Sequence, residues 1–244
     1  WNTEPEHRGN GRQPHGVMTS LPCFPELLIF DLDGTLIDSI GDISEAVNEF
    51  RRSRSATEHD LDTVRSAVGH GARELCRQVL SDIALPGETE EDLYQAFRKT
   101  YIQQASSPSH ILQWLPGAPQ LLAFLQKNTI QASILTNKPR EVTAVLRPRL
   151  ESAFPWCHII CPEDAGVAKP DPSGLLNILK MEQTRVESAV FVGDSAVDFA
   201  TGRAAGIYTV GLKGGYGKIT PPEPDQWIED LSQLTVMLTE SERR

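Results

Sequence analysis

Two aspartates stand one residue apart directly after a run of apolar residues. Residues 27–30 are Leu-Leu-Ile-Phe, and Asp31, Leu32, Asp33 and Gly34 follow them. Four apolar residues in a row predict a strand that is buried on both faces, and a turn that begins at its end places both carboxylates at the rim of a sheet. A bare Asp-x-Asp is more often a turn or a helix cap, so the pair alone does not establish a catalytic site.

Other polar residues stand at the ends of later apolar runs or in the segments that follow them, and they are Thr136, Asn137, Lys169, Asp194 and Asp198. Thr136 offers a hydroxyl and Asn137 an amide, and both groups can donate to an anion. A lone lysine usually lies on the surface, but Lys169 opens the sequence Lys-Pro-Asp-Pro, whose prolines restrict the backbone and indicate that its direction matters. Asp198 stands one helical turn after Asp194, where a carboxylate also suits a helix N-terminus.

The elements that must position these residues alternate along the chain. Short apolar runs typical of buried strands recur at 130–135, 158–161, 189–192 and 207–212. Helical patterns lie between or after them at 117–127, 141–150, 174–181, 196–205 and 227–238. This alternation predicts an α/β protein with a doubly wound parallel sheet and helices on both faces, in which ligands bind at the carboxyl ends of the strands.

One interval breaks the alternation. Between residues 42 and 107 the pattern predicts helices at 43–52, 60–68, 72–84 and 90–105. We therefore expect a catalytic core formed by residues 21–41 and 108–244, with a four-helix cap domain of residues 42–107 inserted over the carboxyl ends of its strands. Residues 1–20 are rich in Gly, Pro, Asn, His and charge, which is typical of a disordered leader.

The composition limits the possible partners. With 33 acidic and 23 basic residues the net charge is −10, which disfavours nonspecific binding to nucleic acid or to anionic lipid. No stretch approaches the roughly 18 consecutive apolar residues of a membrane span, and the first residues lack the pattern of a secretory signal. We expect a cytoplasmic protein with no nucleic-acid or membrane partner, which handles any phosphate through local cations.

Four motifs, taken together and in order, resemble those of the haloacid dehalogenase superfamily of phosphotransferases, and within it the phosphoglycolate phosphatase-like group with a helical type 1 cap. They are Asp-Leu-Asp-Gly-Thr at 31–35, Leu-Thr-Asn-Lys at 135–138, Lys-Pro-Asp-Pro at 169–172 and Gly-Asp-Ser-Ala-Val-Asp at 193–198. The resemblance covers about residues 27–238. The chain departs from the usual pattern at 161–164 and at Gly202, which falls inside a predicted helix and costs roughly 1 kcal/mol there relative to alanine.

The resemblance implies roles that phosphoryl transfer also requires. Asp31 is the expected nucleophile, which forms an aspartyl-phosphate, and Asp33 is the expected general acid and base. Thr136, Asn137 and Lys169 are expected to bind the negative phosphoryl oxygens, and Thr136 and Lys169 to assist catalysis.

Several carboxylates near a phosphate repel it unless a cation lies between them. The resemblance implies that Asp31, Asp194 and the backbone carbonyl of Asp33 bind Mg²⁺, which prefers hard oxygen ligands. Asp198 is expected in a second layer, where it holds metal-bound water or orients the motif lysine. For Ser195 we favour capping of the following helix over contact with the substrate.

The cap is expected to select the substrate. Residues 69–73 are Gly-His-Gly-Ala-Arg and resemble a Gly-x-Gly segment that lies opposite the catalytic aspartates in relatives with this cap. His70 and Arg73 are then placed to meet the non-phosphate end of the substrate, and a guanidinium suits a carboxylate. The alternative is that the glycines form an ordinary turn and that Arg73 is solvated.

These expectations describe a Mg²⁺-dependent phosphatase that acts on a small soluble phosphate monoester, first of all 2-phosphoglycolate, as a monomer or a homodimer. A sugar phosphomutase, a pyrophosphatase or a nucleotidase could use the same core, and a substrate panel separates them. A non-catalytic module that binds a phosphorylated ligand would normally lack one of the two first aspartates, and Asp31 and Asp33 are both present.

Overall fold

A parallel six-stranded sheet forms the centre of the structure, a computed structural model that describes residues 21–107, 112–217 and 220–242. The leader expected at residues 1–20 lies outside the described residues. The strands are β1 (Leu27–Phe30), β2 (Gln131–Leu135), β3 (Ile159–Ile160), β4 (Ala189–Gly193), β5 (Tyr208–Leu212) and β6 (Gln226–Ile228). Their order is β3-β2-β1-β4-β5-β6, and every neighbouring pair is parallel, which confirms the predicted sheet.

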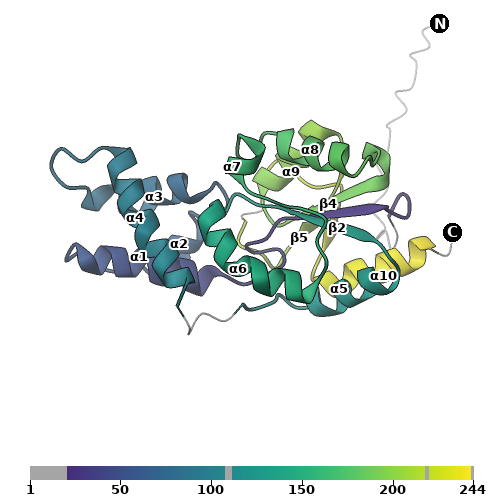
Figure 1. Ribbon diagram of the computed structural model, residues 1–244, viewed down its shortest axis with the longest axis horizontal. Helices are drawn as coiled ribbons and strands as arrows, with labels where there is room; N and C mark the ends of the chain where they lie inside the picture. Colours follow the sequence, from purple (N-terminus) through teal and green to yellow (C-terminus); the bar gives the residue numbers. More distant parts are fainter. Residues whose placement is uncertain (1–20, 108–111, 218–219, 243–244) are drawn as a thin grey trace, which may run out of the picture.

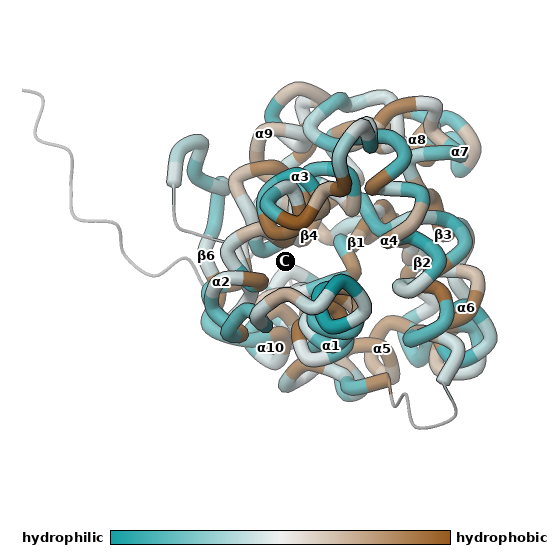
Figure 2. The backbone as a smooth tube through the Cα atoms, turned by 90° about the vertical axis from the view of Figure 1, so that its left-hand side faces the viewer, coloured by the Kyte–Doolittle hydropathy of each residue, from teal (hydrophilic) through white to brown (hydrophobic). Residues whose placement is uncertain are grey.

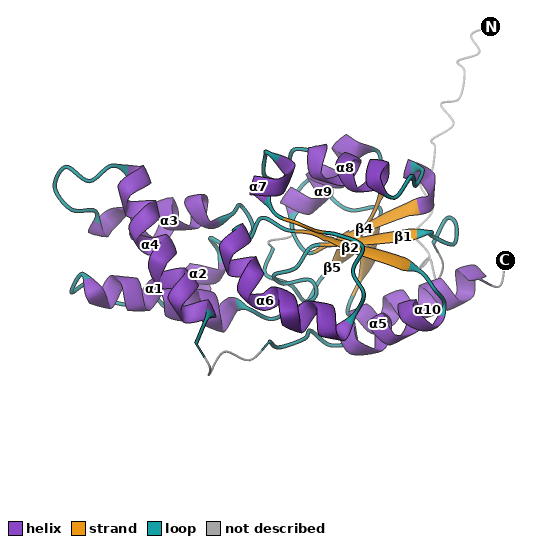
Figure 3. Cartoon of the chain, viewed as in Figure 1, coloured by secondary structure: helices purple, strands orange, loops and turns teal. Residues whose placement is uncertain are grey.

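Helices cover both faces of this sheet (Figures 1 and 3). One layer holds α5 (Ala118–Lys127), α6 (Arg140–Ala153) and α10 (Leu231–Glu242), and the other holds α7 (Pro162–Ala165), α8 (Ser173–Met181) and α9 (Ala196–Ala205). Successive residues of a strand point to opposite faces. In β1, Leu28 and Phe30 join the apolar cluster of the first layer, and Leu27 and Ile29 join that of the second.

The strand order reverses next to β1. The chain builds β1, β2 and β3 toward one edge and then returns to place β4 on the other side of β1. Phe30 is level with Val192, and the Asp31 amide donates to the Val192 carbonyl at 2.8 Å. Such a switch point leaves a crevice because the loops after the two strands run in opposite directions. Asp31 and Asp194 stand at the two sides of this crevice.

Four further helices lie between β1 and β2 in the sequence, at one end of the molecule (Figure 1). They are α1 (Ile40–Ser53), α2 (Leu61–Arg65), α3 (Ala72–Leu80) and α4 (Glu90–Ala105), with a 3₁₀ turn at Ser81–Ile83. Together we call them the cap. They enclose an apolar cluster of their own, which includes Val47, Leu75 and Phe97. Figure 2, viewed from this end, shows apolar and hydrophilic residues alternating along these helices.

The last helix begins later than the pattern at 227–238 predicts. Gln226–Ile228 form strand β6 instead, with Trp227 paired to Gly211, and α10 begins at Leu231. A Cβ on Gly211 would lie 2.8 Å from the Trp227 ring, and the ring of Phe199 packs edge-on against the indole at 5.2 Å. Trp227 is therefore a sheet residue that covers the end of β5, and the prediction of helix there was wrong.

Close packing explains the glycine inside α9. A Cβ at Gly202 would lie 2.1 Å from Cγ2 of Thr209 on β5, so only glycine lets helix and strand approach so closely. Among the described residues, no helix combines the length and the apolar character needed to cross a membrane.

Candidate active site

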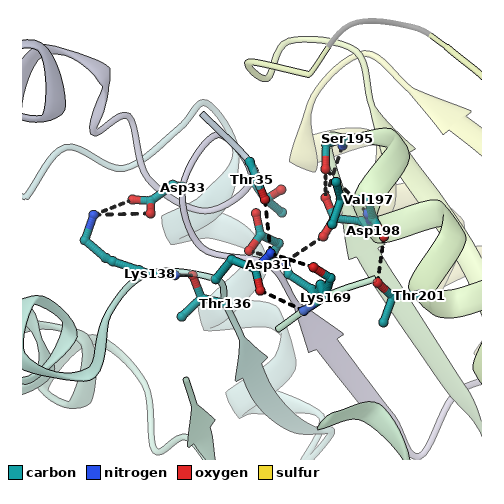
Figure 4. Close-up of polar contacts among 12 residues, drawn as sticks. Asp31, Asp33, Thr35, Thr136, Lys138, Lys169, Ser195, Val197, Asp198 and Thr201 are labelled. Atoms are coloured by element: carbon teal, nitrogen blue, oxygen red, sulfur yellow. Dashed lines mark hydrogen bonds and ion pairs between the residues drawn. The ribbon is translucent and has the colours of Figure 1, made fainter. Parts of the chain in front are cut away.

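Three buried carboxylates meet at the crevice between β1 and β4. One oxygen from each of Asp31, Asp194 and Asp198 lies within 4.8 Å of the others. Lys169 reaches the same point from the loop before α8, and its Nζ donates to Oδ1 of Asp31 and to Oδ1 of Asp198, at 2.6 Å in both cases. Figure 4 shows the ammonium between the two carboxylates. The structure thus brings together four of the residues that the sequence motifs singled out.

The cluster holds more negative than positive charge. Burial raises the pKa of Asp31 well above its usual value, with Lys169 opposing the rise and Asp198 adding to it. Burial and the neighbouring Asp198 also raise the pKa of Asp194, to about 6. Burial lowers the pKa of Lys169, but the two carboxylates beside it outweigh that effect and raise it. Three hard oxygen donors with one ammonium suit a further divalent cation such as Mg²⁺, so the residues present fit the expected metal.

Backbone donors hold Asp194 in place from the loop after β5. Its Oδ2 accepts from the amides of Tyr216 at 2.6 Å and Gly217 at 3.0 Å, and its Oδ1 from the Thr35 hydroxyl at 3.3 Å. The turn after β1 also presses against it, because a Cβ at Gly34, where φ is +85°, would lie 2.6 Å from Oδ2. Sequence reasoning missed the loop of Tyr216, although the glycines around it indicate a close backbone approach.

Asp33 is turned away from this cluster. Its carboxylate accepts from Nζ of Lys138 at 2.9 and 3.2 Å (Figure 4). It also accepts from the hydroxyl of Ser39 at 2.6 Å. Lys138 also donates to the Tyr101 hydroxyl of α4 at 2.8 Å. Burial lowers the pKa of Lys138, but Asp33 and Tyr101 outweigh it and raise the pKa. Lys138 stands in the second sequence motif, yet sequence reasoning gave it no role.

Thr136 and Asn137 follow β2, and their side chains differ in the hydrogen-bond donors that they leave free for a ligand. The Thr136 oxygen accepts from the Lys138 amide at 3.1 Å, which leaves its hydroxyl hydrogen to donate. The Asn137 side chain accepts from the Lys169 amide at 2.8 Å and donates to the carbonyls of Lys169 at 3.0 Å and Gly69 at 3.2 Å. This side chain therefore positions Lys169 and the cap, and the geometry does not support the expected donation from it to phosphate.

Ser195 caps α9, as predicted. The Asp198 amide donates to the Ser195 oxygen at 3.4 Å, and Oδ2 of Asp198 accepts from the Ser195 amide at 3.1 Å in a reciprocal capping box. The other oxygen of Asp198 accepts from Lys169. Asp198 thus links the helix N-terminus to the lysine and fixes the direction of its ammonium.

A cavity of about 40 Å³ lies between these residues and the cap. The core contributes Asp31, Asp33, Thr136, Asn137, Lys138 and Pro139, and the cap contributes Ile43, Val68, Gly69, Gly71, Ala72, Leu75 and Tyr101. The turn that contains Gly69 and Gly71 therefore faces the aspartates, as expected. The cap side is mostly apolar, and the buried ammonium of Lys138 stands at its border with the core.

His70 and Arg73 do not line this cavity. They border a separate surface hollow, where Arg73 forms an ion pair with Glu91 and its guanidinium lies 4.2 Å from the centre of the Tyr94 ring. Its side chain is 63% exposed. Ala72 and Leu75, three residues apart, share the face of α3 that meets the cavity, and Arg73 points to another face. His70 and Arg73 therefore lie outside the cavity that Asp31 and Asp33 border, a position that does not favour their expected contact with the substrate.

Comparisons with known proteins agree with the fold of the core. The model of the haloacid dehalogenase-like hydrolase family matches residues 28–212. Phosphoglycolate phosphatase 1 of Pseudomonas aeruginosa is 36% identical over 215 residues, which cover 86% of this chain and 78% of that protein. The phosphoglycolate phosphatase of Pseudomonas fluorescens strain Pf0-1 is 33% identical over 214 residues, with the same shares of 86% and 78%.

Solved structures show the same fold. A predicted phosphoglycolate phosphatase from Haemophilus somnus superposes with a TM-score of 0.77 at 22% identity, covering 88% of this chain and 98% of that one. A haloacid dehalogenase-like hydrolase from Bacteroides fragilis superposes with a TM-score of 0.72 at 26% identity, covering 86% and 99%.

Proposed function

Because this chain belongs to the haloacid dehalogenase-like hydrolase family, we propose that it is a Mg²⁺-dependent phosphatase that hydrolyses a small phosphate monoester. The observation that carries the proposal is the buried cluster of Asp31 with Lys169, Asp194 and Asp198, in which Asp31 also borders a cavity. Phosphoryl transfer needs a nucleophile in line with the leaving group and positive charge around the transferring oxygens. This cluster offers the first through Asp31 and the second through Lys169 and the proposed cation.

The proposed reaction has two steps. In the first, an oxygen of Asp31 attacks phosphorus, the bond from phosphorus to the leaving oxygen breaks, and that oxygen takes a proton from Asp33. In the second, water attacks the aspartyl-phosphate, gives a proton to Asp33 and releases phosphate together with the Asp31 carboxylate. In the structure the Asp33 carboxylate is bound by Nζ of Lys138 and by the hydroxyl of Ser39. The pair with Lys138 must therefore open before the first step, so that the Asp33 carboxyl, which already borders the cavity, is free to reach the leaving oxygen.

The remaining residues position the substrate. Thr136 can donate its free hydroxyl hydrogen to a phosphoryl oxygen, and Lys169, directed by Asp198, can hold another. Asp31, Asp194 and the backbone carbonyl of Asp33 would hold Mg²⁺. When bound, the ion offsets the negative charge that nucleophile and substrate bring together.

Among phosphate monoesters we propose 2-phosphoglycolate first, because the two relatives compared above are named for it. Its carboxylate needs a cation on the cap side of the cavity, and Lys138 is the buried cation that lines it there. A carboxylate that binds Lys138 would also release Asp33 from its ion pair, which is the change that the first step requires. This assignment replaces Arg73, which is committed to Glu91 on the outer surface.

The test is a panel of 2-phosphoglycolate, sugar phosphates, a nucleoside monophosphate, pyrophosphate and 4-nitrophenyl phosphate, measured as phosphate release with and without Mg²⁺. We expect Mg²⁺-dependent hydrolysis that Asp31→Asn reduces to background. Asp62→Asn, the same change at an exposed carboxylate of α2, should leave activity unchanged. Acid-quenched enzyme should carry a phosphoryl group on Asp31. A folded Asp31→Asn protein that keeps a tenth of the wild-type rate contradicts the proposed nucleophile.

A further inference from the structure

Tyr216 lies where the core meets the cap. It belongs to the loop after β5, and its half-buried ring packs against the apolar cluster of the cap. The ring also borders the turn after β1, since a Cβ at Gly34 would lie 3.0 Å from Cδ2 of the tyrosine. One side chain thus contacts the loop that carries Asp31, while its own loop contacts Asp194 and its ring contacts the cap.

The backbone of this loop binds the acidic cluster. The amides of Tyr216 and Gly217 both donate to Oδ2 of Asp194, and hydrogen bonds to a charged acceptor are the stronger kind. The close approach of this loop to Asp194 depends on glycine, because a Cβ at Gly215 would lie 2.2 Å from Cβ of Asp194. Any ligand that fixes the Asp194 carboxylate therefore also restricts this loop.

The tyrosine hydroxyl binds the first turn of the cap. It accepts from the amides of Ser39 at 2.5 Å and Ile40 at 3.0 Å, and it donates to Oδ1 of Asp38 at 2.6 Å. The first amides of a helix have no acceptor within the helix and normally need a capping side chain. Ser39, at the N-cap of α1, forms no such cap, and its hydroxyl donates to Asp33. The hydroxyl of Tyr216 instead serves the amides of Ser39 and Ile40 at the very start of α1, and the Ile40 amide also reaches Oδ1 of Asp38 at 3.3 Å.

We propose that Tyr216 is a positioning residue that couples cation binding at Asp194 to the anchoring of α1, and through α1 to the seating of the cap. This inference rests on the proposed function in one respect, namely that a cation binds at Asp194. A cation that fixes Asp194 orders the loop of Tyr216, and the ordered hydroxyl holds the first turn of α1. Coupling between two sites is reciprocal, so loss of the hydroxyl must also weaken cation binding.

The experiment measures amide hydrogen exchange at residues 39 and 40 in the full chain during a Mg²⁺ titration, with the Mg²⁺ affinity taken from calorimetry. We expect saturating Mg²⁺ to slow exchange at these two amides by about 5-fold or more in the wild type. Tyr216→Phe keeps the ring and both backbone donors but removes the hydroxyl. In this variant the Mg²⁺ effect on exchange should disappear and the affinity for Mg²⁺ should fall by about 5-fold. The control Tyr208→Phe, the same change at a half-buried tyrosine of β5, should retain both.

The outcomes separate this inference from the proposed function. If Mg²⁺ binds and supports turnover but does not slow exchange at residues 39 and 40 of the wild type, the coupling is wrong and the phosphatase stands. An equal Mg²⁺ effect in Tyr216→Phe overturns the coupling in the same way. If the wild type shows neither binding of Mg²⁺ nor activity with it, the cation site itself is wrong. The wild-type titration decides the matter even if Tyr216→Phe fails to fold.

Discussion

Replacement of Lys138 by methionine should destabilise the protein by leaving Asp33 without its cation. The Lys138 side chain is 3% exposed and that of Asp33 is 13% exposed. Removing one partner of a buried ion pair costs about 3 to 5 kcal/mol. Asp33 keeps its bond from Ser39 and some contact with water, and methionine fills the space of the lysine stem. We therefore expect the free energy of unfolding at pH 7 to fall by about 2 to 3 kcal/mol.

The sign of the pH dependence follows from the raised pKa of Lys138 in the folded state. A cation with a raised folded pKa contributes its full stability below its unfolded pKa, near 10.4, and loses it as the pH rises through the folded value. The pair is thus fully formed at pH 7. The difference between wild type and Lys138→Met should stay constant from about pH 6 to pH 9.

Urea unfolding followed by circular dichroism measures the effect, and a double-mutant cycle isolates the pair. Asp33→Asn in the Lys138→Met background should cost less than in the wild type, with a coupling energy of about 1 to 3 kcal/mol. A loss below 0.5 kcal/mol for Lys138→Met, together with a coupling energy near zero, would refute the reasoning that this ion pair is buried and necessary.

Three further predictions concern packing, recognition and the metal. Gly202→Ala should lower the free energy of unfolding by about 1 to 3 kcal/mol despite the better helix propensity of alanine, because its Cβ would meet Thr209. Gly41→Ala in α1, where a Cβ meets nothing within 4 Å, is the matched control in urea unfolding and should be neutral or stabilising. In steady-state kinetics, Lys138→Met should reduce kcat/KM for 2-phosphoglycolate by about 10-fold or more beyond its effect on 4-nitrophenyl phosphate. Arg73→Met should change kcat/KM little for both substrates. The reverse pattern would restore Arg73 as the specificity residue. Excess chelator should abolish phosphate release, and added Mg²⁺ should restore it. Ca²⁺ should not restore it, because its looser coordination could engage Asp31 through both oxygens and hinder attack on phosphorus. Equal rates with Mg²⁺ and Ca²⁺ would contradict this explanation.

Asp31, Thr136 and Asp194 lie near one another because each directly follows a strand whose carboxyl end meets the same edge of the sheet, and that could be predicted from the sequence. Buried parallel strands are continuous apolar runs, so β1 and β4 are visible in the sequence, and Asp31 and Asp194 follow them directly. A parallel sheet then leaves little freedom in where those two carboxylates lie.

The direction of individual side chains could not be predicted. Arg73 was expected to meet the substrate because residues 69–73 resemble a segment that lies opposite the catalytic aspartates in relatives. One position along a helix turns a side chain by about 100°, and that resemblance does not fix which face Arg73 takes. The pairing of Asp33 with Lys138 joins residues more than 100 positions apart and depends on how the cap closes over β2. Strand β6 was missed because Trp227, at its centre, packs against Phe199 and Gly211. Only the folded chain brings these residues into contact.

The position of the cap in the sequence has a consequence for how the chain assembles. β1 pairs with β2 across an interval of about 100 residues and with β4 across a longer one, so the ribosome completes β1 long before either neighbour exists. Bringing distant strands together costs chain entropy that grows with the length of the loop between them. The cap helices follow β1 directly and share an apolar cluster built mostly from nearby residues, so they can collapse first and shorten that loop. A substitution such as Phe97→Ala, deep in the cap and remote from every strand of the sheet, should therefore slow the formation of the sheet as well as loosen the cap.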